Sequence, residues 1–134
     1  MLYQVVKRIE EIAQSQPNVN FTGEGDVYVL NSLQTIAYSA VIVTQNTHTE
    51  NDDYRTYNFY VFYCDRLLSD KSNRLEIQSA GLECLSNIAA TLRDEYEVGD
   101  IRYTPFNERF DSECAGVFME ISVSVPLEAC ADEF

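Results

Sequence analysis

Apolar residues recur every three or four positions in two segments, which predicts two amphipathic helices. The first helix is expected over residues 1–16, because Pro17 closes the pattern. The second is expected over residues 73–97, where Asn73 is a suitable N-cap and Glu76 stands three residues later, as in a capping box. The apolar stripe of this second helix comprises Leu75, Leu82, Leu85, Ile88, Ala89, Leu92 and Tyr96, and it is widened by Ile77, Gly81 and Cys84.

Between the two helices the apolar pattern has a period of two, which is typical of strands. Residues 26–64 are expected to hold a short strand at 26–30 and longer strands at 36–43 and 56–64. A polar connection, residues 45–55, joins the two longer strands into a hairpin. This connection is longer than an ordinary hairpin loop, and long connections are usually functional or mobile.

A second hairpin is expected after the second helix, over residues 100–126. Its connection is placed at 107–116, its last strand at 117–125, and the acidic tail at 127–134. The order of elements predicts a single α+β domain over residues 1–134. We expect an antiparallel sheet of four to five strands, with the long helix packed on one face and the N-terminal helix beside it.

The charge of the chain excludes some partners. Its 134 residues include 9 Lys and Arg against 22 Asp and Glu, which gives a net charge of −13. Binding to nucleic acid or to an anionic membrane surface draws its affinity from Lys and Arg, so neither is expected here. No apolar run approaches the length of a spanning helix, and the first residues lack a signal-peptide pattern. The acidic excess is concentrated in the second half of the chain.

The residues that usually carry chemistry do not form a recognisable constellation. The four cysteines have no Cys-x-x-Cys spacing, and we expect them to be reduced, with Cys64 and Cys84 as buried thiols. The single histidine, His48, lies in the polar connection and is expected to have no catalytic role. The acidic residues of that connection lack the spacing of a calcium loop. We therefore predict no enzymatic activity, no metal and no cofactor.

The strand at 56–64 is aromatic on both sides. Tyr57, Phe59, Val61 and Tyr63 face one side, whereas Tyr60, Phe62 and Cys64 face the other. A sheet with one covering layer needs only one apolar face, so the other face must be covered as well. The cover is either another part of the same chain or a neighbouring subunit. Aromatic residues with polar tips are enriched at interfaces, which favours the neighbouring subunit.

The order of the elements resembles the tail-terminator and tail-completion proteins of tailed bacteriophages. Two stretches are similar to small virion proteins of crAss-like gut phages, namely Asp65–Asn73 leading into Ile77–Ser79, and Arg109–Gly116 before the last strand. The resemblance implies a structural virion protein, assembled in the host cytoplasm, that forms a homo-oligomeric ring of six or twelve copies at the portal–tail junction. It also implies adjacent portal, connector or tail ring proteins as partners, DNA only as passing cargo, and no membrane.

The resemblance also implies where copies and neighbouring rings would touch this chain. The connection at 46–55 would reach an adjacent ring or subunit, the connection at 107–116 would be a second docking loop, and the strand at 57–64 would join the inter-subunit sheet. The candidate interface residues are Asn46, His48, Glu50, Asp52, Asp53, Tyr54, Arg55, Tyr57, Tyr60, Phe62, Arg109, Phe110 and Asp111.

A second hypothesis follows from the charge alone. An acidic protein can imitate DNA by displaying carboxylates at phosphate-like spacing, and it then inhibits a basic nucleic-acid-binding protein. Such binding would collapse at high salt. The acidic residues of this chain do not form one continuous stripe along the sequence, and this hypothesis leaves the aromatic strand unexplained.

Overall fold

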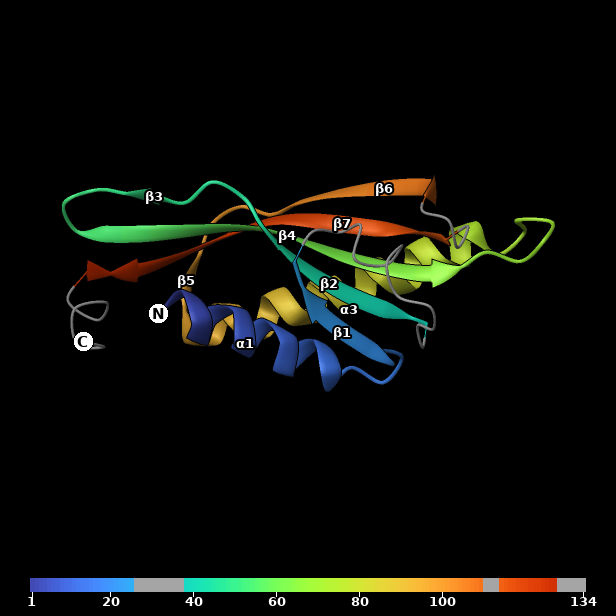
Figure 1. The fold of residues 1–134 in the computed structure, drawn as a ribbon, viewed down its shortest axis with the longest axis horizontal. Coiled ribbons are helices and arrows are strands. Elements are labelled where there is room, and N and C mark those ends of the chain that lie inside the picture. The colour runs from blue at the N-terminus through green and yellow to red at the C-terminus, as the bar shows by residue number, and fades with distance from the viewer. Residues whose placement is uncertain (26–37, 110–113, 128–134) are drawn as a thin grey trace.

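The structure is a computed structural model that describes residues 1–25, 38–109 and 114–127. Within these residues it contains two helices, α1 (Leu2–Gln14) and α3 (Arg74–Glu95) (Figure 1). The strands of the described part are β1 (Phe21–Glu24), β2 (Ala40–Gln45), β3 (Thr49–Glu50), β4 (Tyr54–Arg66), β5 (Glu97–Val98), β6 (Arg102–Arg109) and β7 (Cys114–Pro126).

The described strands form one mixed sheet with the order β1-β2-β4-β7-β5. In addition, β3 pairs with β4 and β6 pairs with β7. β1 runs parallel to β2, whereas the other pairs are antiparallel. The α+β architecture is therefore confirmed, but the expectation of a purely antiparallel sheet of four to five strands was wrong. The strands that the pattern missed are two residues long or, in β1, contain Gly23, so alternation cannot reveal them.

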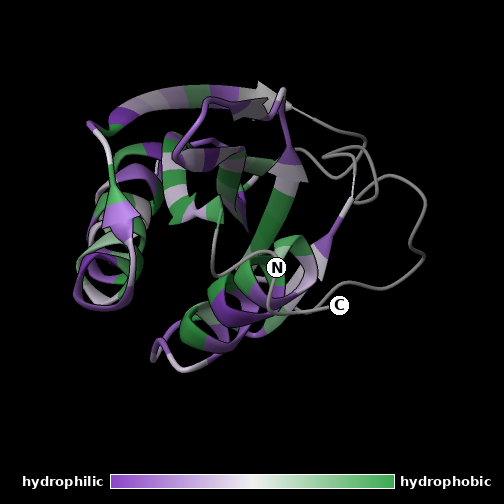
Figure 2. Ribbon diagram, turned by 90° about the vertical axis from the view of Figure 1, so that its left-hand side faces the viewer, coloured by the Kyte–Doolittle hydropathy of each residue, from purple (hydrophilic) through white to green (hydrophobic). Residues whose placement is uncertain are grey.

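Both helices lie on the same side of the sheet (Figure 2). Their apolar faces and the facing side chains of β2, β4 and β7 form one core cluster, in which Phe59, Ile9, Leu85 and Met119 are almost fully buried. α3 approaches the sheet closely at Gly81, where an added Cβ would lie 2.6 Å from Val117 Cγ1 and 2.8 Å from Tyr63 Cδ1. A glycine at this position therefore lets the longest helix of the described part lie against β4 and β7.

The stripe predicted for α3 is only partly correct. Ile77, Gly81 and Cys84 are buried, as are most of the later stripe residues. Leu75 and Leu82 are instead exposed, with 70% and 43% of their surface accessible. The buried face is set by the residues that continue the line of Ile77 and Gly81 along the helix, and Leu75 and Leu82 lie to one side of that line.

Asn73 is the N-cap residue of α3, as predicted, but its side chain makes no capping hydrogen bond, so the capping box is not formed. Its Oδ1 accepts a hydrogen bond from the Leu68 amide at 2.9 Å, and its Nδ2 donates to the Arg66 carbonyl at 3.2 Å. The side chain therefore closes the connection between β4 and α3. An amide can satisfy either kind of backbone group, and the sequence alone does not decide between them.

The strands of the second hairpin extend further into the expected connection than predicted. β6 continues to Arg109 and β7 begins at Cys114, so most of the expected connection at 107–116 is strand. Pro105 is accommodated because, within the described residues, β6 pairs with β7 alone and is an edge strand. The predicted strand at 26–30 and the tail from 128 onward lie outside the described residues.

Candidate functional site

The polar connection at 45–55 is in part a continuation of the sheet, because it contains β3 and the first residues of β4, while residues 46–48 and 51–53 lie outside the strands. β3 pairs with β4 through Thr49–Thr56 and Glu50–Arg55, and the start of β4 pairs with the end of β7. We call residues 49–56 together with 124–126 the arm. In Figure 1 the tip of the arm extends at the left beyond the helices, whereas Val125 at its base is buried in the core cluster.

Side chains and backbone hold the tip of the arm in one conformation. Asn51 Oδ1 accepts hydrogen bonds from the amides of Asp53 and Tyr54 at 2.8 and 2.7 Å, and the Asn51 amide donates to the Tyr54 carbonyl at 2.9 Å. The Leu127 amide donates to the Asp53 carbonyl at 3.0 Å, which ties the tip to the end of β7. The tip is therefore a preformed and acidic turn.

Arg55 joins the two strands of the arm. Its Nε lies 2.8 Å from Glu50 Oε1 on β3, and its Nη1 donates to Tyr57 Oη at 3.4 Å. Glu50 is thus already paired within the chain. Asn46, Asp52, Asp53 and Tyr54 are exposed, and Tyr54 keeps 39% of its surface accessible. These four are the candidate residues of the connection that a partner could contact without unfolding the arm.

His48 lies where β2 and β3 are interrupted, and it is more enclosed than its polar surroundings suggested. β2 pairs with β4 up to Gln45–Phe59, and β3 resumes at Thr49–Thr56, so one extra residue stands on the β2–β3 side. His48 Nδ1 accepts the Asn58 amide hydrogen at 3.1 Å and Nε2 lies 3.0 Å from Gln45 Oε1. Its ring is 5.4 Å from that of Tyr57 and 5.8 Å from that of Phe59, edge to face.

The face of the sheet opposite the helices carries an aromatic cluster. The ring of Phe62 lies 5.0 Å from that of Phe118 and 6.2 Å from that of Phe106, and the ring of Tyr60 lies 5.8 Å from that of Phe118. Phe62 is only 7% exposed, and Tyr60 is half-buried. The second apolar face thus packs substantially within one chain.

The other candidate interface residues differ in how accessible they are. Tyr57 is buried under the helices, on the opposite face from Tyr60 and Phe62. β4 is paired along its length with β7 and along half of it with β2, so its central part has no free backbone edge. Arg109 ends β6, and Phe110 and Asp111 lie outside the described residues.

A polar groove of about 460 Å³ lies at the base of the arm. Asn46, Asn58 and Ser122 line one part of it, and Asn58 Nδ2 donates to the Thr47 carbonyl at 2.6 Å. Arg102 Nε and Glu120 Oε2 face each other at 3.8 Å in another part. These groups can exchange hydrogen bonds with a partner, but they do not include a nucleophile held by a base. In the part of the chain that the structure describes, no group of three His, Cys, Asp or Glu side chains is placed to hold a metal ion.

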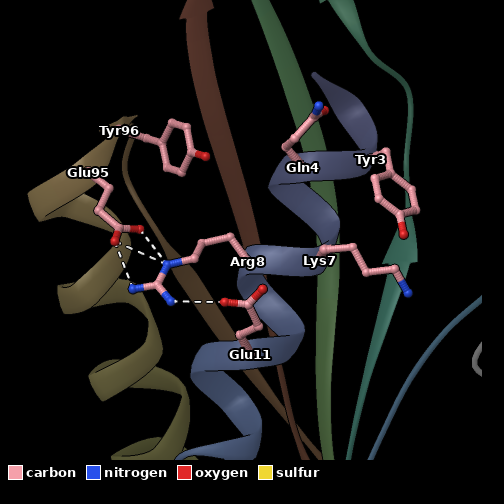
Figure 3. A pocket seen from close by; sticks show the side chains of 7 residues that line it. All are labelled: Tyr3, Gln4, Lys7, Arg8, Glu11, Glu95 and Tyr96. Atoms are coloured by element: carbon pink, nitrogen blue, oxygen red, sulfur yellow. Dashed lines mark hydrogen bonds and ion pairs between the residues drawn. The ribbon is translucent and has the colours of Figure 1, made fainter.

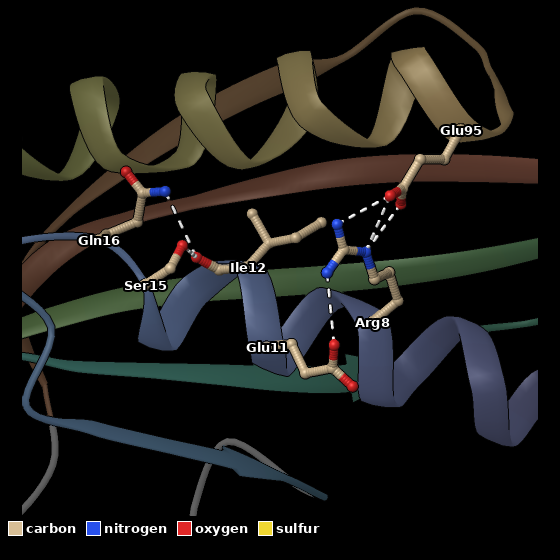
Figure 4. Close-up of polar contacts among 6 residues, drawn as sticks. All are labelled: Arg8, Glu11, Ile12, Ser15, Gln16 and Glu95. Atoms are coloured by element: carbon tan, nitrogen blue, oxygen red, sulfur yellow. Dashed lines mark hydrogen bonds and ion pairs between the residues drawn. The ribbon is translucent and has the colours of Figure 1, made fainter.

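A second groove, of about 660 Å³, separates α1 from the end of α3 and was not predicted (Figure 3). Arg8 spans it, because its Nη2 lies 2.7 Å and its Nε 2.8 Å from the two carboxylate oxygens of Glu95. Arg8 also pairs with Glu11 at 3.3 Å, and Ser15 and Gln16 bond the Ile12 carbonyl at the end of α1 (Figure 4). Arg8 and Glu95 are 87 positions apart in the sequence, so no local pattern could have revealed this pair.

Replacing Arg8 with glutamine is expected to weaken the attachment of α1 to α3. The hydrogen bonds from Arg8 hold the pKa of the Glu95 carboxyl below its ordinary value, so the pair stabilises the fold above the pH range in which that carboxyl titrates. The stabilisation is lost as the pH falls through that lowered pKa. Thermal melts should therefore show a lower Tm for Arg8→Gln at neutral pH and low salt, and a smaller difference at acidic pH or high salt.

Lys7→Gln is the matched control for this prediction, because among the described residues Lys7 pairs within α1, with Glu10 at 3.3 Å. Its Tm should change less than that of Arg8→Gln. Equal changes in the two variants would contradict a role of Arg8 between the helices.

The described cysteines are reduced, as predicted. Cys64, Cys84 and Cys114 are buried free thiols, and Cys130 lies outside the described residues. Burial raises the pKa of Cys84 to about 11. A hydrogen bond with Cys114, together with burial, raises the pKa of Cys64. Neither thiol is a thiolate at neutral pH, so neither is set up as a nucleophile.

Comparison with known proteins assigns no family to this chain. No protein-family model matches the chain, and a search of curated proteins finds no match. Among the described residues there is no helix with the length and apolar character needed to cross a bilayer.

Proposed function

We propose that this chain is a structural protein of a tailed-phage virion, without enzymatic activity, and that copies of it form a ring at the portal–tail junction. The observation that carries the proposal is the arm. The first residues of β4 and the last residues of β7 continue past the helices, and the turn between β3 and β4 forms a fixed acidic tip. The three residues of β4 in the arm span roughly 10 Å, so the tip stands away from the body of the chain, where a neighbouring copy or an adjacent ring can contact it.

The edges of the sheet support contacts between copies. In the described part of the chain, β1 pairs only with β2, and β6 pairs only with β7. A strand at the edge of a sheet presents unpaired backbone groups that a strand of another chain can use. A sheet that continues from one copy to the next would therefore run through β1 or β6 rather than through the central part of β4.

The charge supports a role beside DNA without binding it. With a net charge of −13, the chain repels a passing duplex, as the wall of a channel must if DNA is to move through it. The inhibitor hypothesis gains less support, because described acids such as Glu50, Glu95 and Glu120 face Arg55, Arg8 and Arg102. Carboxylates paired in this way do not present a row of free charges to a basic partner.

Electron microscopy of particles that carry defined variants tests the proposal. Changing Asp52 and Asp53 at the tip to lysine should leave the fold intact, because both side chains are exposed, and should yield particles whose heads and tails fail to join. Changing the exposed acids Glu76 and Glu83 on α3 to lysine alters the charge equally and should give normal particles.

Particles that lack the protein altogether complete the test. They should lose their genome or their tails. Intact, genome-filled particles with normal tails in its absence would end the proposal. Size-exclusion chromatography with light scattering on the purified chain shows whether rings form without the neighbouring proteins.

A further inference from the structure

At the interruption between β2 and β3, Asn58 makes one ladder hydrogen bond with backbone and one with a side chain. The Asn46 amide still donates to the Asn58 carbonyl at 2.8 Å, so the carbonyl of Asn58 has a backbone partner. The Asn58 amide instead donates to the imidazole of His48, at 3.1 Å. One ring nitrogen thus takes the place of a carbonyl in the ladder where the arm leaves the body of the sheet.

This arrangement fixes the protonation state of the imidazole. Nδ1 can accept the Asn58 hydrogen only when it carries no proton, and Nε2 then carries the proton and donates it to Gln45 Oε1 at 3.0 Å. A doubly protonated ring would point a hydrogen at the Asn58 amide. The ladder bond at this position therefore exists only with neutral His48.

In the described part of the chain, the charged ring keeps its hydrogen bond from Nε2 to Gln45 Oε1 but gains no carboxylate as a direct partner. On the β4 side lie the rings of Tyr57 and Phe59, and the hydroxyl of Tyr57 is bonded by Arg55, which Glu50 pairs from β3. On the β2 side lies Gln45, whose Nε2 donates to Glu24 Oε1 on β1 at 3.3 Å. Glu50 is therefore separated from His48 by Arg55 and Tyr57, and Glu24 is separated from it by the Gln45 amide. Burial lowers the pKa of His48 below its ordinary value of 6.5.

We infer that His48 is a pH-sensitive joint at the base of the arm: neutral, it completes the sheet at Asn58, and protonated, it releases the Asn58 amide and loosens the arm from the body. This inference does not depend on the proposed ring, because it concerns the isolated chain. With the Asn58 bond broken, the His48 ring takes up a proton at its ordinary pKa, and with the bond made it does so at a lower pKa. The bonded state therefore becomes less stable relative to the loosened state as the pH falls from 6.5. This loss of stability is complete once the pH is below the pKa of His48 in the bonded state.

Amide hydrogen exchange measured by NMR on the full-length chain tests this inference. Between about pH 8 and about pH 5, the Asn58 amide should lose protection with the same midpoint at which the His48 ring titrates. The amide of Val61, in the centre of β4, should keep its protection. The nitrogen shifts of the ring should show Nε2 protonated and Nδ1 free at neutral pH.

His48→Gln is the matched variant, because an amide oxygen can accept the same hydrogen bond but cannot titrate in this range. Exchange of Asn58 in the wild type, divided by that in the variant at each pH, removes the intrinsic effect of pH on exchange. The ratio should rise on acidification. A flat ratio, an imidazole with Nδ1 protonated at neutral pH, or equal loss of protection at Val61 would overturn the inference, and the ring measurements on the wild type decide it if the variant does not fold.

Discussion

Replacing Gly116 with alanine is expected to lower the free energy of unfolding by about 3 kcal/mol or more. Gly116 on β7 lies opposite Cys64 on β4, on the face away from the helices. A Cβ at this position would lie 1.8 Å from the carbonyl oxygen of Tyr63 and 3.1 Å from Phe106 Cζ. The first contact is with backbone, so relief requires the two longest strands to separate. Urea denaturation of the purified chain measures the loss.

Gly99→Ala is the control for this prediction. The same added carbon at Gly99 would approach no atom more closely than Ser122 Cβ at 3.9 Å, which is an ordinary contact. Its stability should change by no more than about 0.5 kcal/mol. If Gly116→Ala were as mild as Gly99→Ala, the close approach of β7 to the Tyr63 carbonyl would not exist in solution.

The sequence predicted the parts of this fold whose signal is local and repeated. α1 and α3 have helical spacing over several turns, and β4 and β7 alternate over many residues, so their existence and approximate bounds were predicted correctly. β1, β3 and β5 were missed because two to four residues cannot display a period. The pattern also placed Leu75 and Leu82 in the core, although both are exposed. Only packing against the sheet decides which side of a broad apolar arc is buried.

The candidate site shows the same division. The polar connection was recognised as unusual by its length and composition, but its arm depends on pairing with β7, which lies some seventy residues later in the chain. The sequence places His48 in the polar connection without a structural role, because a histidine among polar residues gives no sign of a backbone partner. Its position follows from a bulge between β2 and β3, and a bulge has no signature in this sequence. The pairing of Arg8 with Glu95 is likewise a product of the packed fold.

Replacing Phe62 with alanine is expected to destabilise the isolated chain by about 3 kcal/mol, as for a buried aromatic residue. Phe62 is only 7% exposed and packs against Phe118 and Phe106 on the face without helices. The cost arises from lost burial and from the cavity left among the remaining rings. Urea denaturation at a concentration where the chain is monomeric measures it, because only contacts within one chain then contribute.

Two further variants provide the reference values of destabilisation for a buried and for an exposed side chain. Phe59→Ala removes a ring that is 1% exposed on the helix-covered face of the same strand and should cost about 3–5 kcal/mol. Leu75→Ala trims a side chain that is 70% exposed and should cost no more than about 0.5 kcal/mol. If Phe62→Ala resembles Phe59→Ala in the monomer, the second aromatic face is built by the chain itself, and contacts between copies must use the arm and the sheet edges. If it resembles Leu75→Ala, the aromatic cluster forms only when another chain covers it.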